Sequence, residues 1–116
     1  MKKPQTTTTL PTGTPPRLAA IDIGTNSFRC IVAEVDPQEG FRILDDEKAQ
    51  VRLGEGLNQT GEISPAAQQR AIEALQRMCG IVTGLGATMV EVVATSAVRK
   101  ASNRENFIAA VKTATG

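Results

Sequence analysis

The spacing of hydrophobic and polar residues predicts three strands in the first half of the chain. They cover residues 18–23, 28–35 and 41–51, with short turns at 24–27 and 36–40. The first strand is mostly apolar, which is typical of a strand covered on both faces of a sheet. The third is more polar, so we expect it near a sheet edge.

Apolar residues take helical spacing after a glycine-containing loop at 52–62. Ser64 is a suitable N-cap, and Pro65 suits the first turn. The predicted apolar stripe of this helix consists of Ala67, Ala71, Ile72, Leu75, Met78, Cys79, Val82 and Leu85. Gly84 and Gly86 are expected to end the helix.

A fourth strand and a second helix complete the pattern. Residues 89–94 form a short apolar run, and Ser102 with Glu105 predicts a capping box for the last helix. We expect Phe107, Ile108 and Val111 of that helix to face inward.

The resulting order, β-β-β-α-β-α, predicts an α/β fold in which a mixed sheet carries helices on its faces. A right-handed crossover would return the fourth strand parallel to the first. Because ligands bind at the carboxyl ends of such strands, we expect residues 22–29 and 95–99 to converge there. Residues 1–17, with four consecutive threonines and four prolines, are predicted to be a disordered tail.

An aspartate stands inside the first predicted strand. Asp22 is costly there unless it pairs, binds a metal or takes part in chemistry, or unless it caps the turn that follows. That turn, 24–27, contains a glycine followed by threonine, asparagine and serine, and Arg29 comes soon after. An acid, then hydrogen-bond donors, then a cation are typical of a metal–phosphate site.

Composition excludes several other functions. The chain has 116 residues, enough for one domain, and a net charge of +1, so it has no general attraction for nucleic acid or membranes. The lack of histidine excludes histidine-based catalysis, and 3% aromatic residues argue against base stacking. Cys30 and Cys79 are expected to be buried thiols in a reducing cytoplasm. The prediction is therefore a cytoplasmic protein without nucleic-acid or membrane partners.

Four segments resemble the exopolyphosphatase / guanosine pentaphosphate phosphohydrolase (Ppx/GppA) family of the actin, Hsp70 and sugar-kinase superfamily. They are residues 20–29 (AIDIGTNSFR), 51–57 (VRLGEGL), 93–99 (VATSAVR) and 103–107 (NRENF). The resemblance implies a ribonuclease H-like (actin-like ATPase) half-domain. Residues 18–116 would be the N-terminal portion of the first actin-like domain.

The resemblance also implies roles for individual residues. The implied catalytic residues are Asp22, Arg29 and Arg99, and Asp22 would also hold Mg²⁺. The implied phosphate-binding residues are Gly24, Thr25, Asn26, Ser27, Thr95 and Ser96. Arg52 lies in a matching loop without a defined role. As alternatives, the two catalytic arginines are ordinary surface cations, and residues 95–96 are only the entry to a helix.

The implied activity is Mg²⁺-dependent release of terminal phosphate from inorganic polyphosphate or guanosine pentaphosphate, by a homodimer in full-length members. The family's second phosphate loop and general-base glutamate have no counterpart in this sequence, so we expect it to be a fragment carrying one half-site. A non-catalytic phosphate-binding protein is one alternative. A sugar or acetate kinase relative is another, which the turn at 25–29 (TNSFR) disfavours.

Overall fold

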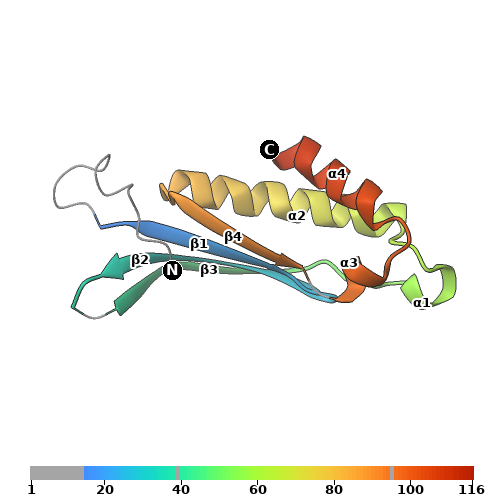
Figure 1. The fold of residues 1–116 in the computed structure, drawn as a ribbon, viewed down its shortest axis with the longest axis horizontal. Helices are drawn as coiled ribbons and strands as arrows, with labels where there is room; N and C mark the ends of the chain where they lie inside the picture. The colour runs from blue at the N-terminus through green and yellow to red at the C-terminus, as the bar shows by residue number, and fades with distance from the viewer. Residues whose placement is uncertain (1–14, 39, 95) are drawn as a thin grey trace.

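The computed structural model describes residues 15–38, 40–94 and 96–116, which form one mixed sheet and its helices (Figure 1). The elements are β1 (Arg17–Ile23), β2 (Ser27–Asp36), β3 (Gly40–Gln50), α1 (Leu57–Thr60), α2 (Pro65–Gly84), β4 (Met89–Ala94), α3 (Ser96–Lys100) and α4 (Arg104–Thr115). The four predicted strands and two predicted helices are confirmed, while the short helices α1 and α3 were not predicted. The predicted tail lies outside the described residues up to position 14, and β1 begins one residue before its predicted start.

The sheet has the order β3-β2-β1-β4. β2 runs antiparallel to both β1 and β3, and β4 runs parallel to β1. The parallel pairing follows from the crossover through α2, because a helix returns the chain to the starting end of the sheet. The predicted topology is therefore confirmed, with β3 at one edge.

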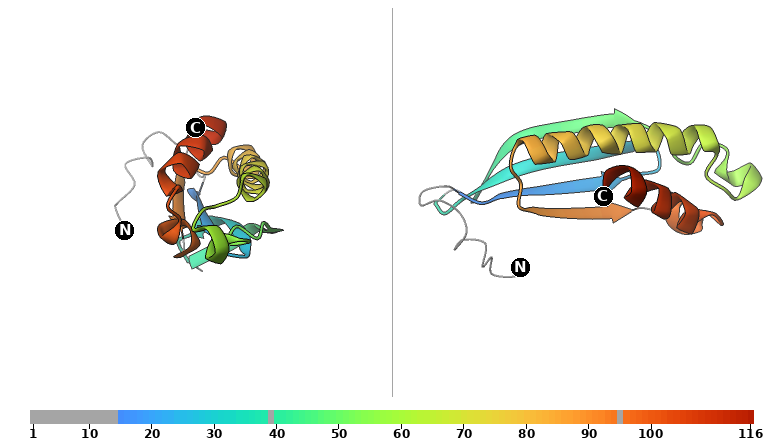
Figure 2. Two further views of the ribbon diagram at one scale, coloured as in Figure 1. Left: turned by 90° about the vertical axis from the view of Figure 1, so that its right-hand side faces the viewer. Right: turned by 90° about the horizontal axis from the view of Figure 1, so that it is seen from above.

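Both long helices lie on the same face of the sheet, where α4 packs against α2 (Figures 1 and 2). The core lies under α2, where Phe28, Val32 and Met78 are completely buried. The prediction that the first strand is covered on both faces is wrong: Ala20 and Asp22 are exposed. The reason is that no helix of the described residues covers the other face, which we call the open face.

The start of α2 is built as predicted. The Ser64 hydroxyl accepts a hydrogen bond from the Ala67 amide at 3.1 Å, which satisfies one amide of the first turn. The buried stripe also includes Ala74, while Ile72 and Cys79 are only partly buried. The helix ends at Gly84, close to its predicted end.

The predicted capping box of the last helix is wrong. α4 begins at Arg104, after Asn103, and Asn103 makes no side-chain cap. Its amide instead binds Ile63 twice, accepting from the backbone N–H at 2.9 Å and donating to the carbonyl at 3.0 Å. The Ser102 hydroxyl donates to the Gly61 carbonyl at 3.1 Å. These contacts attach the loop before α2 to the start of α4.

Burial along α4 also differs from the prediction. Phe107 is 1% exposed and Val111 packs against the core, as expected, but Ile108 is 41% exposed. Ile108 lies beside β4, an edge strand whose other long side is unpaired in the described sheet.

A β-bulge changes the pairing of β2 with β3. Near the hairpin, Ala33 pairs with Ile43, but the next pair is Val32 with Asp45, so Leu44 is an extra residue. Because strand side chains alternate between faces, one extra residue reverses which face each later residue of β3 occupies.

Both cysteines are free thiols, as predicted. Cys30 is completely buried, and this burial raises the pKa of its thiol, with the nearby Asp45 carboxylate adding to the effect. Cys79 on α2 is half-buried. None of the helices in the described part of the chain has the length and apolar character needed to span a bilayer.

Candidate functional site

A row of residues crosses the open face near the carboxyl end of β1. Asp22 pairs with Arg29 of β2 on one side and with Val93 of β4 on the other. Arg29 in turn pairs with Lys48 of β3. Because directly paired residues share a sheet face, a carboxylate and two cations stand side by side here.

Asp22 is exposed, and within the described ranges its carboxylate has no hydrogen-bond or ion-pair partner. It therefore does not cap the turn that follows, which removes that alternative. Asp22 and Arg29 line a hollow of about 320 Å³, whose other lining residues are Ala20, Ile21, Ile31 and Val93. An unpaired carboxylate beside a cavity is available to a ligand.

Arg29 is held by a neighbour that the sequence did not single out. Its Nε donates to Asp46 Oδ1 at 3.0 Å, and its Nη2 donates to Oδ2 at 2.7 Å. The hydrogen bond between them is the main cause that lowers the pKa of the Asp46 carboxyl and raises the pKa of Arg29, and the charge attraction adds to it. Both groups therefore stay charged at neutral pH.

The turn between β1 and β2 is tight. The Gly24 amide donates to the Ser27 carbonyl at 3.1 Å. A Cβ at position 24 would lie 2.5 Å from that same carbonyl oxygen, so only glycine fits. The structure thus places the predicted phosphate-binding residues 24–27 in one compact loop at the end of the sheet.

A second loop supports this turn. The Asn26 carbonyl accepts hydrogen bonds from the amides of Val51 at 2.9 Å and Arg52 at 2.8 Å. The Thr25 carbonyl accepts from the Gly54 amide at 3.1 Å. Arg52 has a positive φ of 53°, which is unusual for a residue other than glycine. Its backbone, rather than its exposed side chain, is what contacts the turn.

Arg70 of α2 fixes the second loop in place. Its Nε donates to the Val51 carbonyl at 2.7 Å, and its Nη2 donates to the Arg52 carbonyl at 3.2 Å and to Glu55 Oε1 at 2.9 Å. A chain of hydrogen bonds therefore runs from the long helix through the loop to the turn at 24–27.

The end of β4 meets this site as predicted. Ile23 pairs with Ala94, so the chain leaves β1 and β4 side by side. Arg99 of α3 donates from Nη1 to the Ala94 carbonyl at 3.0 Å, which directs its side chain back toward the strand ends. Thr95 lies outside the described residues, and Ser96 is the first residue of α3.

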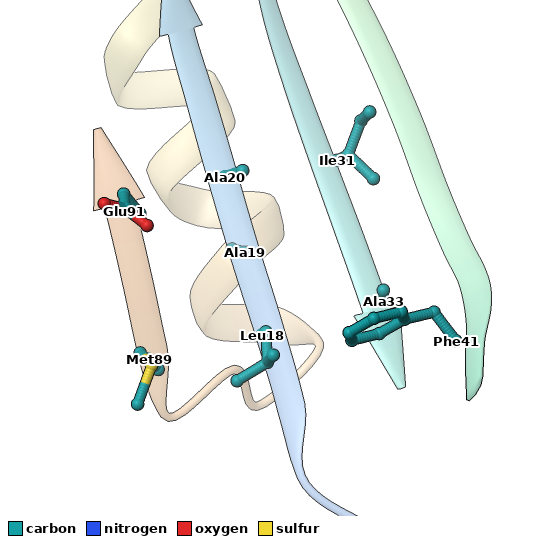
Figure 3. Close-up of a pocket in the computed structure, with 8 residues that line it drawn as sticks. All are labelled: Leu18, Ala19, Ala20, Ile31, Ala33, Phe41, Met89 and Glu91. Carbon is teal, nitrogen blue, oxygen red and sulfur yellow. The ribbon is translucent and has the colours of Figure 1, made fainter. Parts of the chain in front are cut away.

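The rest of the open face is mostly apolar, with Glu91 as a charged exception. A hollow of about 520 Å³ lies there (Figure 3), and it is lined by Leu18, Ala19, Ala20, Ile31, Ala33, Phe41, Met89 and Glu91. The Phe41 ring reaches from β3 across Ala33 of β2. The open face therefore changes from apolar to charged toward the end that carries the turn.

Asp22 is the residue expected to hold Mg²⁺, and the side chains around it decide how such an ion could be bound. The described residues contain no cluster of three or more His, Cys, Asp or Glu side chains able to hold a metal. Mg²⁺, however, usually sits on one or two carboxylates together with substrate phosphates and water. Asp22 alone fits an ion that is held jointly with a phosphate.

Three residues of the site were missed from the sequence: Asp46, Lys48 and Arg70. Lys48 was interpreted as a solvated charge, because its place beside Arg29 depends on the bulge at Leu44. Arg70 acts through backbone carbonyls 18 and 19 residues away. No local sequence signal marks such contacts.

Comparison with known proteins finds close relatives. The family model described as the Ppx/GppA phosphatase family matches residues 31–116. Exopolyphosphatase 2 of Mycobacterium tuberculosis (strain H37Rv) is 42% identical over 96 residues, which cover 80% of this chain and 30% of the relative. A guanosine-5'-triphosphate,3'-diphosphate pyrophosphatase of Photobacterium profundum is 37% identical over 98 residues, covering 84% of this chain and 19% of that protein.

Solved structures show the same fold. The Aquifex aeolicus Ppx/GppA phosphatase superposes with a TM-score of 0.83 at 28% identity, over 87% of this chain and 33% of that one. An exopolyphosphatase from Cytophaga hutchinsonii gives a TM-score of 0.81 at 31% identity, over 85% of this chain and 31% of the other. The described fold is thus that of part of an actin-like ATPase-fold protein. The chain spans a third or less of the length of these four relatives.

Proposed function

Because the chain belongs to the Ppx/GppA phosphatase family, we propose that it contributes the first phosphate-binding half-site of a phosphohydrolase. The substrates would be inorganic polyphosphate or guanosine pentaphosphate, from which terminal phosphate is released. The names of the relatives support this class of substrate. The cytoplasmic location stays a prediction.

One observation carries the proposal: an unpartnered carboxylate, Asp22, stands directly beside a guanidinium, Arg29, at a hollow on the open face. A carboxylate alone would repel phosphate. A site that bound phosphate through a cation alone would not need a carboxylate beside it. Together they suit a phosphate that arrives with a divalent cation, because each group then meets an opposite charge.

Each group of the site has a part in this proposal. The turn at 24–27 would receive the phosphate, and Arg29 would neutralise its charge with bidentate hydrogen bonds. Arg99 of α3, whose side chain lies against the end of β4, would also neutralise phosphate charge. Asp22 is the residue that would hold Mg²⁺, which when bound neutralises phosphate charge and makes phosphorus more electrophilic.

A second candidate is binding without hydrolysis. Asp22 is the only carboxylate that lines the hollow among the described residues, and it is assigned to the metal. No second carboxylate of that hollow is left to activate water. A phosphate-binding role for these residues by themselves is therefore kept as the alternative.

The test measures two quantities on the same protein: phosphate release from long-chain polyphosphate and from guanosine pentaphosphate, and binding of both, with and without Mg²⁺. Asp22→Asn is compared with Glu73→Gln, which removes a carboxylate from the exposed side of α2. Mg²⁺-dependent release that is lost only in Asp22→Asn supports the phosphohydrolase. Mg²⁺-dependent binding without release supports the second candidate, and the lack of both overturns the proposal.

A further inference from the structure

Asp46 is a charged residue of the open face for which the proposed function gives no role. We propose that Asp46 is a positioning residue, which holds the Arg29 guanidinium in the orientation that receives phosphate. This inference rests on the proposed function, because it takes Arg29 to be a phosphate ligand.

The contact between the two residues is directional. Asp46 engages the Nε and Nη2 side of the guanidinium with both carboxylate oxygens, at 3.0 and 2.7 Å. A guanidinium is a planar fork with five N–H donors, so this pairing fixes its plane. Its other N–H groups have no partner among the residues described here. They are the donors left for a phosphate.

The bulge in β3 is what brings Asp46 to this position. Without the bulge, Leu44 would pair with Val32 and Asp46 with Cys30, on the face that α2 covers. With it, Ile31 pairs with Asp46, and Asp46 stands on the open face diagonal to Arg29. Bulges often redirect side chains beside functional sites, and this one moves a carboxylate next to a cation.

Stability does not explain the pair. The side chains of Arg29 and Asp46 are 56% and 42% exposed, and ion pairs this exposed contribute little to the folded state. The pair can therefore be broken without unfolding the protein. This property separates a positioning role from a structural one.

The direction of the binding change distinguishes positioning from simple charge. Asp46 is a negative charge beside a proposed anion site, so removing it should strengthen phosphate binding if only Coulomb attraction matters. If Asp46 orients Arg29, removing it should weaken binding, because the guanidinium must then be ordered when the phosphate binds. The two accounts predict opposite signs.

The experiment is calorimetric titration of the 116-residue protein with tripolyphosphate and Mg²⁺. We expect Asp46→Asn to weaken binding about three- to tenfold, the effect of ordering one long side chain. Asp46→Glu should restore most of the affinity, since it keeps the carboxylate. Glu91→Gln, which removes an exposed carboxylate on the same face, should bind as tightly as the unsubstituted protein or more tightly. The thermal unfolding midpoint should be the same in all four proteins.

The other outcomes are decisive. Equal or tighter binding by Asp46→Asn overturns the inference and makes Asp46 a competitor of phosphate. Weakened binding that Asp46→Glu does not restore also overturns it. If the unsubstituted protein does not bind tripolyphosphate, the proposed function fails and the inference fails with it.

Discussion

Phe28 and Phe41 lie on neighbouring strands but on opposite faces of the sheet. Phe28 is completely buried under α2, whereas Phe41 is 63% exposed on the open face. The covered face carries the apolar core. The open face, in contrast, contains Asp22, Arg29 and Asp46 at one end, where charged groups keep access to water and ligands. The sheet thus separates packing from chemistry, and residues of the two faces should respond differently to substitution.

The largest expected effect is on the covered face. Phe28→Ala should lower the free energy of unfolding by about 3–5 kcal/mol, because it removes a fully packed ring and leaves a cavity. Phe41→Ala should change it by less than about 0.5 kcal/mol, as for other exposed positions. Urea unfolding followed by circular dichroism measures both. Similar losses for the two variants would show that the open face is packed in solution, and the comparison would fail.

The next effect is at the turn that joins the two strands of the site. Gly24→Ala should destabilise the protein by about 1–3 kcal/mol, because its Cβ would lie 2.5 Å from a backbone oxygen of Ser27. It should also abolish tripolyphosphate binding. Gly80→Ala in α2 is the matched control: nothing lies within 4 Å of its Cβ, so it should stabilise the helix by about 0.5–1 kcal/mol. If Gly24→Ala left the stability unchanged, the turn would have room for a Cβ and would not be tight.

A smaller effect is expected where α2 supports the site from the covered side. Arg70→Met should cost about 1 kcal/mol, because the carbonyls of Val51 and Arg52 lose a charged donor. Amide hydrogen exchange at Arg52 and Gly54 should become faster, since both amides bind the turn. Arg77→Met removes an exposed α2 arginine and should change neither quantity. Unchanged exchange in Arg70→Met would show that the loop keeps its position without the helix.

The sequence predicted the covered face better than the open one. Apolar periodicity located the strands and α2, because burial imposes a regular spacing on residues such as Leu75 and Met78. The candidate site depends instead on the register in which β3 pairs with β2. Asp22 and Arg29 were identified by their motif, but the bulge at Leu44 brings Asp46 beside Arg29. The polar pattern of β3 does not encode that bulge.

The other incorrect predictions concern residues whose surroundings are set by distant parts of the chain. Asn103 was not predicted to bind Ile63, because its partner lies 40 residues away. A local rule instead favoured a cap by Ser102, and the tertiary contact replaced it. Ile108 was expected inside because its spacing is helical, but β4 is the last strand of the described sheet. Periodicity finds an apolar face and cannot tell what covers it.

The smallest expected effect is on the pH dependence of stability. It should differ between two carboxylates of the sheet, Glu34 and Asp46, as pH falls. Glu34 is 7% exposed and bonds to Arg42 and Arg17. Its hydrogen bond with Arg42 lowers the pKa of Glu34, with Arg17 adding to the effect. Its stabilising contribution is therefore complete above the unfolded pKa, about 4.3, and is lost as pH falls through the lower folded value.

Unfolding free energies measured from neutral pH down to about pH 3, which spans the carboxyl range, test this comparison. Glu34→Gln should flatten the loss of stability at the acid end relative to the unsubstituted protein. Asp46→Asn should flatten it less, because both side chains of the Arg29 pair are largely exposed and water screens their attraction. The change stays modest even for Glu34, since the side chains of Arg17 and Arg42 are 37% and 68% exposed. A larger change in Asp46→Asn than in Glu34→Gln would mean that the Asp46–Arg29 pair stabilises the fold, and Asp46 would then be structural rather than a positioning residue.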